Sequence, residues 1–283
     1  MRISDILAQA KREIMNAGVS NSGLDVLILL SHTLSFSKEQ IVFNPDFELN
    51  LKQEEDFLKA VARRVAREPI SHIINKREFF GADFFVNSDV LDPRPDSEIL
   101  IEAVLQKFSN KALQIKILEV GVGSGCLIIT LLTLYNQAQA TGLDISKKAL
   151  EISAKNAETH KVLSRLDLRN SDVFSALNSD EKFDLIISNP PYIPTADILE
   201  LEVEVNKYEP LSALDGGVDG LDFYRRIAVA ARNFLKENGE IFLEIGYGQK
   251  EKITEIFAEQ NFTLQAFKSD LSGVDRVLQF KSK

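Results

Sequence analysis

The chain has 283 residues, of which 45% are hydrophobic and 27% charged, and its formal net charge is −9. This length allows one large or two modest domains, and the acidic balance argues against bulk binding to nucleic acid, whose phosphates require a basic face. A single Cys excludes an intrachain disulfide and fits a reducing cytoplasm. Three scattered His give no metal-ligand cluster, and no apolar run reaches the roughly 18 residues of a membrane span, so neither metal nor membrane is expected.

Residues 1–75 have the periodicity of a small helical domain. Apolar residues recur at helical spacing between Ile3 and Ile14, and Gly18 ends the run. Further helices are expected over residues 24–30, 38–42 and 51–65. This domain either stabilises the rest of the protein or docks a large protein substrate, and composition does not decide between the two.

A β-hairpin linker is predicted over residues 76–92, where aromatic and aliphatic pairs surround Gly81 and Asn87-Ser88. From 93 to 283, strand-like and helix-like segments alternate, which is typical of a parallel sheet covered by helices.

A glycine-rich turn lies between the apolar segment 115–118 and a helix-like stretch that begins at Cys126. Its sequence is Glu119-Val120-Gly121-Val122-Gly123-Ser124-Gly125. Glycine allows a tight turn and close approach of backbone to a ligand. A dinucleotide fingerprint would need its third glycine where Cys126 stands. Glu119 would repel a pyrophosphate but suits a cationic or zwitterionic ligand such as S-adenosylmethionine.

Two acidic residues follow the next two predicted strands. Asp144 ends the segment 140–143 and is a candidate for the ribose hydroxyls, with a helix cap as the alternative. Asp172 follows the segment 165–169 and is a candidate for the adenine amino group, with Val173 or Phe174 against the ring; its alternative is an ordinary turn residue. Open α/β sheets bind ligands at these strand ends.

Asn189-Pro190-Pro191-Tyr192 directly follows the apolar run 183–188. The Asn189 side-chain oxygen and the Pro190 carbonyl can each accept one N–H of a planar NH2 group. Pro191 fixes the backbone between them, and Tyr192 offers a flat face for an amide or a base. The alternative is a strand end followed by a Pro-rich loop.

With these motifs in view, the whole chain resembles the protein-(glutamine-N5) methyltransferases that act on peptide chain release factors. The last two-thirds resembles a class I S-adenosylmethionine-dependent methyltransferase. The other segments that carry the resemblance are Arg67-Glu68-Pro69-Ile70, Glu78-Phe79-Phe80-Gly81, Val90-Leu91-Asp92-Pro93-Arg94-Pro95-Asp96-Ser97-Glu98, Tyr208-Glu209-Pro210, Leu214-Asp215-Gly216-Gly217-Val218-Asp219-Gly220-Leu221, Glu244-Ile245-Gly246 with Gln249, and Asp270-Leu271-Ser272-Gly273-Val274-Asp275-Arg276.

The chain departs from the family pattern at a few positions. Glu119 stands where Asp is usual, Val122 where Thr is usual, and His72-Ile73-Ile74-Asn75 replaces the usual Tyr-Ile-x-Gly. Val173 replaces an aromatic residue, which puts stacking on adenine in doubt. None of these positions belongs to the Asn189–Tyr192 clamp.

The resemblance implies a Rossmann-like, mostly parallel seven-stranded sheet over 93–283, with the helical domain 1–75 docking the substrate. It implies a cytoplasmic enzyme, expected to be a monomer without direct nucleic-acid contact. The expected substrate is the Gln of a Gly-Gly-Gln motif in class-1 release factors, methylated with release of S-adenosylhomocysteine. Asn189 to Tyr192 would hold the amide. The cofactor residues would be Glu119, Gly121, Val122, Gly123, Ser124, Gly125, Asp144, Asp172, Val173 and Asn189.

The segment 93–98 is expected to wall the active site, with Arg94 or Glu98 in reach of the clamp or cofactor. The alternative is a rigid Pro-rich linker with a helix cap at Ser97. Two other functions stay open: methylation of adenine N6 in nucleic acid, because adenine also offers a planar NH2, and a non-catalytic cofactor-binding module. Transfer of label from S-adenosylmethionine to protein, to DNA or to neither separates them.

Overall fold

The computed structural model describes all residues from Met1 to Lys283 and resolves two compact units. The first comprises Met1–Lys76 together with Glu202–Tyr208, and the second comprises Arg77–Leu201 together with Glu209–Lys283. The return of residues 202–208 to the first unit is a feature that the sequence did not indicate. None of the helices combines the length and apolarity needed to cross a membrane.

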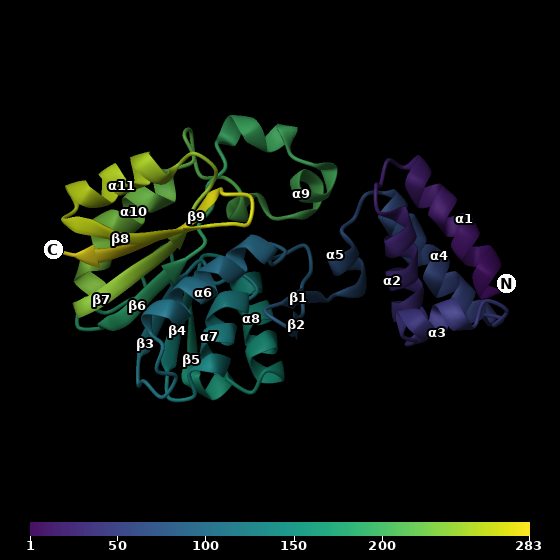
Figure 1. Ribbon diagram of the computed structural model, residues 1–283, viewed down its shortest axis with the longest axis horizontal. Helices are drawn as coiled ribbons and strands as arrows, with labels where there is room; N and C mark the ends of the chain where they lie inside the picture. The colour runs from purple at the N-terminus through teal and green to yellow at the C-terminus, as the bar shows by residue number, and fades with distance from the viewer. The chain divides into compact units, whose positions relative to one another are not determined.

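The first unit is all-helical (Figure 1). Its helices are α1 (Ile3–Asn16), α2 (Ser22–Leu34), α3 (Lys38–Phe43), α4 (Leu51–Val65), α5 (Ile70–Ile74) and α9 (Val203–Tyr208). Capping boxes start α3 and α4: Ser37 pairs with Gln40, and Asn50 pairs with Gln53. The expected helices match α1 to α4, whereas α5, a single turn after a proline, is too short to give a periodic signal.

Buried ion pairs hold α9 in the first unit. Arg64 donates to Asp25 at 2.7 Å and to Glu204 at 3.1 Å, and Arg67 donates to Glu204 at 2.6 Å. Arg64 and Asp25 are buried. Buried charges are tolerated when each has a hydrogen-bonded partner of opposite sign. The basic end of α4 therefore needs the carboxylate that residues 202–208 bring back.

The second unit is built on a seven-stranded sheet in the order β5-β4-β3-β6-β7-β9-β8 (Figure 1). All neighbours pair in parallel except β9, which is antiparallel to β7 and β8. The strands are β3 (Lys116–Val120), β4 (Gln139–Asp144), β5 (Leu166–Asn170), β6 (Phe183–Ser188), β7 (Leu235–Glu244), β8 (Phe262–Ser269) and β9 (Asp275–Ser282). The expected class I methyltransferase fold is confirmed, and the alternation with helices ends at the β8–β9 hairpin.

Helices pack on both faces of this sheet. They are α6 (Glu98–Lys107), α7 (Cys126–Leu134), α8 (Lys147–Thr159), α10 (Asp222–Ala231) and α11 (Lys250–Glu259). Short 3₁₀ segments lie at Pro95–Ser97, Leu163–Arg165, Thr195–Glu200, Leu211–Ala213 and Arg232–Phe234.

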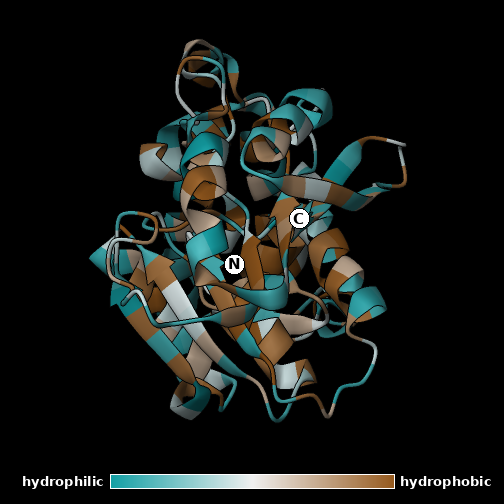
Figure 2. Cartoon of the chain, turned by 90° about the vertical axis from the view of Figure 1, so that its left-hand side faces the viewer, coloured by the Kyte–Doolittle hydropathy of each residue, from teal (hydrophilic) through white to brown (hydrophobic).

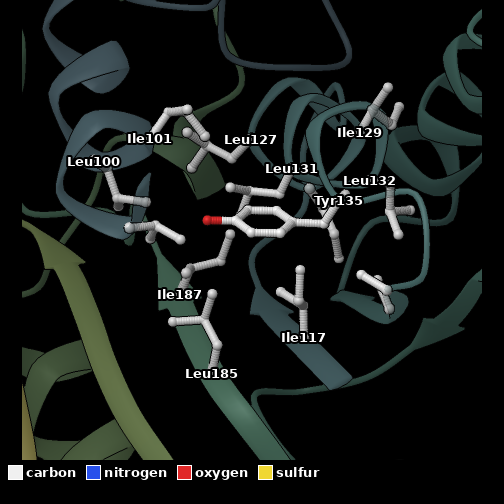
Figure 3. Packing of buried hydrophobic residues seen from close by; sticks show 14 of the residues in the cluster. Leu100, Ile101, Ile117, Leu127, Ile129, Leu131, Leu132, Tyr135, Leu185 and Ile187 are labelled. Atoms are coloured by element: carbon white, nitrogen blue, oxygen red, sulfur yellow. The ribbon is translucent and has the colours of Figure 1, made fainter. Parts of the chain in front are cut away.

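One apolar core lies between α6, α7 and the strands β3 and β6. Leu131 of α7 and Tyr135, which directly follows this helix, pack toward Ile117 of β3 and Ile187 of β6 (Figure 3). The Tyr135 hydroxyl donates to the Phe108 carbonyl at 2.6 Å, so this buried polar group is satisfied. Each fully buried aliphatic side chain contributes about 1.5–3 kcal/mol. Hydrophobic stretches along the strands are visible in Figure 2.

A second core lies on α10 and α11, where Tyr224, Ile227, Ile253 and Phe257 are fully buried. The two cores together fix the sheet, so its strand ends are rigid positions for side chains.

The hairpin is shorter than the sequence indicates. Its strands are β1 (Arg77–Phe79) and β2 (Ala82–Phe84), and residues 85–92 form no strand. Val86 and Val90 instead pack against Ala149 and Ile152 of α8. The apolar side chains of residues 85–92 are therefore buried against a helix. Apolar alternation with a period of two residues predicts a strand there instead.

The chain reverses its order of strands between β3 and β6, which are neighbours although β4 and β5 intervene in sequence. Ligands in open α/β sheets bind outside the carboxyl ends of the strands at such a switch point.

Candidate functional site

A cavity of about 470 Å³ opens at the carboxyl ends of β3, β4 and β6. Ligand sites commonly have volumes of about 300–1,000 Å³. Its wall comes from the glycine loop, the strand ends and two segments distant in sequence. The residues used below that line it are Arg94, Ser97, Glu119, Gly121, Val122, Gly123, Ser124, Cys126, Asp144, Asp172, Val173, Asn189, Pro190, Pro191 and Arg226.

The glycine loop is fixed to β4 by its backbone. The Gly121 and Val122 amides donate to the Leu143 carbonyl at 2.8 and 3.0 Å. Gly121 and Gly123 have φ of +78° and +52°, and no protein atom lies within 4 Å of a Cβ built on either. Backbone is therefore open to close approach at both glycines.

Gly125 differs from the other two glycines, because it does not line the cavity. A Cβ there would lie 2.5 Å from Ser153 Oγ and 2.7 Å from Ile129 Cδ1. Gly125 lets α7 begin against α8. The structure shows a packing role for Gly125, and its contact with the cofactor stays a prediction.

Glu119 is buried at the end of β3, with 1% of its surface exposed. Its Oε2 accepts the Ile128 N–H at 3.1 Å. Burial raises the pKa of this carboxyl well above its usual value, and nearby Asp144 raises it further. A cationic group bound in the cavity would favour its ionised form.

Asp144 ties two loops together. Its Oδ2 accepts the Gly123 N–H at 2.9 Å, and its Oδ1 accepts the Ser146 N–H at 2.8 Å. Burial raises its pKa, against these hydrogen bonds. The cap of α8 is Ser146, whose hydroxyl accepts from Ala149. Asp144 therefore lines the cavity without being the helix cap.

Asp172 is already paired. Its Oδ1 accepts from Arg226 of α10 at 2.5 Å, and its side chain is 57% exposed. Val173 is buried with φ of +50°, which is unusual for a β-branched residue, and its carbonyl accepts from Ser171 Oγ at 2.8 Å. Phe174 stacks on Phe234 with ring centroids 5.2 Å apart and does not line the cavity. Of the two ring contacts expected, only Val173 faces the cavity.

The Asn189 side chain points its amide nitrogen inward, where Nδ2 donates to Ser97 Oγ at 3.2 Å. The amide oxygen is then the atom directed away from that contact. The preceding residue, Ser188, is anchored by its hydroxyl, which donates to the Val120 carbonyl at 2.6 Å. Asn189, Pro190 and Pro191 all line the cavity.

Tyr192 is set behind this surface and does not line the cavity. Burial raises the pKa of its hydroxyl to about 12, so the side chain is neutral. Its carbonyl accepts from Gln249 Nε2 at 2.9 Å, and a Cβ at Gly246 would lie 2.9 Å from its ring. Stacking of the Tyr192 ring on the substrate amide stays a prediction.

Segment 93–98 divides between two roles. Arg94 lines the cavity and donates to both carboxylate oxygens of Glu209 at 2.7 Å. Burial raises the pKa of Glu209 to about 7, against the charge of Arg94. Glu98 lies outside the cavity, where its Oε1 accepts the Phe80 N–H at 2.8 Å and fixes the hairpin turn. Ser97 occupies the N-cap position of α6, but its side chain makes no capping hydrogen bond.

Sequence reasoning gave Ser97 only the alternative role of a helix cap and assigned no role to Glu244, Gln249 or Arg226. Glu244 and Gln249 belong to a family motif at the end of an apolar run. That position was the signal that could have identified them. The contacts of Ser97 and Arg226 join positions far apart in the chain and left no local signal.

Two protein families match this chain. The PrmC N-terminal domain matches residues 5–74, and the methyltransferase small domain matches residues 89–202. The T. thermophilus 16S rRNA methyltransferase in complex with AdoMet and guanosine superposes with a TM-score of 0.52 at 20% identity, over 74% of this chain and 50% of that one. That likeness concerns the fold alone.

Relatives match over nearly the full length. The release factor glutamine methyltransferase of Geobacter sulfurreducens is 39% identical over 98% of this chain and 95% of its own. The bifunctional methyltransferase of Rickettsia felis is 36% identical over 98% of this chain, which spans 58% of that protein. The chain therefore belongs to the release factor glutamine methyltransferase family.

Proposed function

We propose that this enzyme transfers a methyl group from S-adenosylmethionine to the side-chain amide nitrogen of the Gln in a Gly-Gly-Gln motif of class-1 release factors. One observation carries the proposal beyond family membership. Asn189, with its amide nitrogen held inward, shares one cavity with the open glycine loop. An amide acceptor and a cofactor cradle therefore face the same space.

The residues around the loop fit S-adenosylmethionine. Gly121 and Gly123 leave room for the amino-acid end of the cofactor, and Glu119 provides a buried carboxyl for its cationic groups. Asp144 offers the remaining lone pairs of its carboxylate to the ribose hydroxyls, and Val173 supplies an apolar wall for adenine. When bound, the sulfonium supplies the electrophilic methyl group.

The clamp residues act on the substrate amide. Its NH2 group donates one N–H to Asn189 Oδ1 and the other to the Pro190 carbonyl. Both acceptors stabilise the positive charge that develops on nitrogen as the N–C bond forms and the C–S bond breaks. Pro191 keeps them in place and aligned for in-line attack. Neither acceptor is basic enough to take the proton, so the methylated amide loses it to water.

We also propose that the first unit docks the release factor. Its segment around α3 and the start of α4 exposes four apolar side chains: Val42, Phe43, Phe47 and Leu51. Phe43 and Leu51 are 81% and 88% exposed. Contiguous exposed apolar residues are a common feature of protein interaction sites.

The decisive experiment combines the enzyme with labelled S-adenosylmethionine and a purified class-1 release factor, followed by mass spectrometry of the labelled residue. Label is expected on the Gln of Gly-Gly-Gln and on no other residue. A release factor with Glu at that position lacks the NH2 donors and should take up no label. Labelling of adenine in a DNA control, or an unlabelled release factor beside a folded, cofactor-bound enzyme, would contradict the proposal.

Asp144→Ala is expected to weaken S-adenosylmethionine binding roughly 10- to 150-fold. The ribose hydroxyls lose a charged acceptor, and a hydrogen bond to a charged group contributes about 1.5–3 kcal/mol. The substitution also frees the Gly123 amide that Asp144 now holds. Isothermal calorimetry measures the affinity, and Asp167→Ala, at an exposed position outside the cavity, is the matched control. Wild-type affinity in a folded Asp144→Ala protein would remove Asp144 from the site.

A further inference from the structure

A buried carboxyl lies beside the clamp. Glu244 ends β7, the strand next to β6, and Ser188 pairs with Leu243 in their register. Asn189 and Glu244, the residues that follow this pair, therefore leave the sheet side by side. Only 2% of Glu244 is exposed.

Glu244, Ser97 and Asn189 lie together. Asn189 Nδ2 donates to Ser97 Oγ at 3.2 Å, and both side chains lie close enough to the Glu244 carboxyl to lower its pKa by hydrogen bonding. The Ser97 hydroxyl, having accepted from Asn189, is free to donate its own proton to Glu244. Glu244 Oε2 is buried and has no hydrogen-bond partner in this structure, so it is available as an acceptor.

This arrangement determines which way the Asn189 amide faces. Its Nδ2 donates to the Ser97 hydroxyl and lies near the Glu244 carboxyl, which can accept the second N–H, so Oδ1 lies on the opposite side of the amide. The flipped amide would place its oxygen against a carboxylate and its NH2 against the NH2 of a substrate. A carboxylate that accepts from the amide nitrogen also polarises the amide and makes Oδ1 a stronger acceptor.

We propose that Glu244, with Ser97, is a positioning residue that locks and polarises the Asn189 amide for the substrate. This inference rests on the proposed function, because it assigns Asn189 Oδ1 to the substrate NH2. Glu244 touches neither substrate nor cofactor and acts only through Asn189.

The charge state of Glu244 should therefore control the rate. Burial raises its pKa to about 7, Arg276 opposes this shift, and Asp96 adds to it. Arg276 and Asp96 form an ion pair of 2.9 Å, which limits their net effect. The other titratable groups that face Glu244 are Cys126, Tyr192 and Tyr224, whose pKa values are all raised by burial, so they stay neutral.

The sign of the pH effect follows. The ionised carboxylate can accept from both Asn189 and Ser97, whereas protonation removes one acceptor and the charge that polarises the amide. Ionisation is gained as the pH rises through about 7. In the wild-type enzyme, kcat is therefore expected to rise across this range.

The test uses Glu244→Gln, which keeps the side-chain shape but cannot carry the charge. We expect kcat to fall roughly 10- to 100-fold, the rise of kcat near pH 7 to disappear, and KM for S-adenosylmethionine to change little. In an Asn189→Ala background, the same substitution should cost nothing more, because Glu244 acts through Asn189. Ser97→Ala should lower kcat but retain the pH dependence.

Glu240→Gln is the matched control. Glu240 is a buried carboxyl on the same strand that pairs with Lys107 at 2.5 Å, outside the cavity. The Glu240→Gln variant should have a lower melting temperature and an unchanged pH profile of kcat. In the wild type, the NMR signals of the Asn189 side-chain amide should titrate near pH 7, and in Glu244→Gln they should not.

The outcomes separate the two claims. If the wild type does not methylate the release factor, the proposed function fails, and the NMR titration still tests the contact. If the wild type is active but Glu244→Gln keeps its rate and pH profile, the positioning role is wrong. Additive losses in the Asn189→Ala background would also overturn it.

Discussion

Replacing Asn189 with alanine is expected to lower kcat by about 100-fold or more, the scale seen when one pre-organised polar contact to developing charge is deleted. The substrate amide keeps the Pro190 carbonyl but loses its second acceptor, so its nitrogen is held less well in line with the methyl group. Affinity for S-adenosylmethionine should change far less, because in the proposed site the glycine loop and Asp144 would hold the cofactor. Single-turnover kinetics with saturating release factor would measure the chemical step, and calorimetry would measure cofactor binding.

Two further variants serve as comparisons for Asn189→Ala. Asn178→Ala removes an asparagine that lies outside the cavity and should leave kcat unchanged. Asn189→Asp keeps an acceptor but brings a second carboxyl to buried Glu244, so one of the two must take up a proton. Its activity should fall well below the wild type despite the retained oxygen. A folded Asn189→Ala enzyme with the wild-type kcat would show that the amide is held elsewhere.

Helices α1 to α4 of the first unit follow from their periodicity. The segment 51–65 was predicted from its apolar stripe with the bounds that α4 has, and the capping box of Asn50 and Gln53 starts the helix at the same place. The strand 183–188 matches β6 for a similar reason, since a buried parallel strand is a short apolar run that ends abruptly. In these elements local chemistry and tertiary packing favour the same structure.

The return of residues 202–208 to the first unit could not be predicted in this way. It depends on contacts of Arg64 and Arg67 with Glu204, across more than 130 positions of sequence. Residues 85–92 were misread for the opposite reason, since their apolar side chains pack on α8 rather than extend a hairpin. A periodic pattern shows that a face is buried but does not identify what buries it.

The candidate site also has one part that the sequence predicts and another that it does not. The positions of Glu119, Asp144 and Asn189 follow from the rule that parallel strands present their carboxyl ends at one edge. The hydrogen-bond partners of the site residues do not follow from this rule. The contacts Asn189–Ser97 and Arg94–Glu209 join residues that are 92 and 115 positions apart. The packing of Gly125 could not be predicted for another reason: its neighbour Ser153 lies on a helix that the motif does not include.

Gly220→Ala should disable the enzyme from outside the cavity. Gly220 has φ of +74°, and a Cβ there would lie 2.3 Å from the Tyr192 carbonyl oxygen and 2.8 Å from Gln249 Nε2. Backbone cannot yield as a flexible side chain does, so residues 189–192 must shift or the Gln249 contact must break. A misplacement of about 1 Å in a catalytic group can cost on the order of 100-fold in rate, and we expect a loss of kcat of that size.

The Gly81→Ala variant distinguishes displacement of the Tyr192 backbone from the strain of alanine at a positive φ. Gly81 also has φ of +74°, but no atom lies within 4 Å of a Cβ built there. Both variants carry the cost of alanine in the left-handed region, about 1–2 kcal/mol, and both should melt at a lower temperature. Only Gly220→Ala pushes on the Tyr192 backbone, so only it should lose kcat when both are assayed well below their melting temperatures. Equal losses in the two variants would attribute the effect to instability, and an unchanged kcat in Gly220→Ala would mean that the clamp tolerates movement at Tyr192.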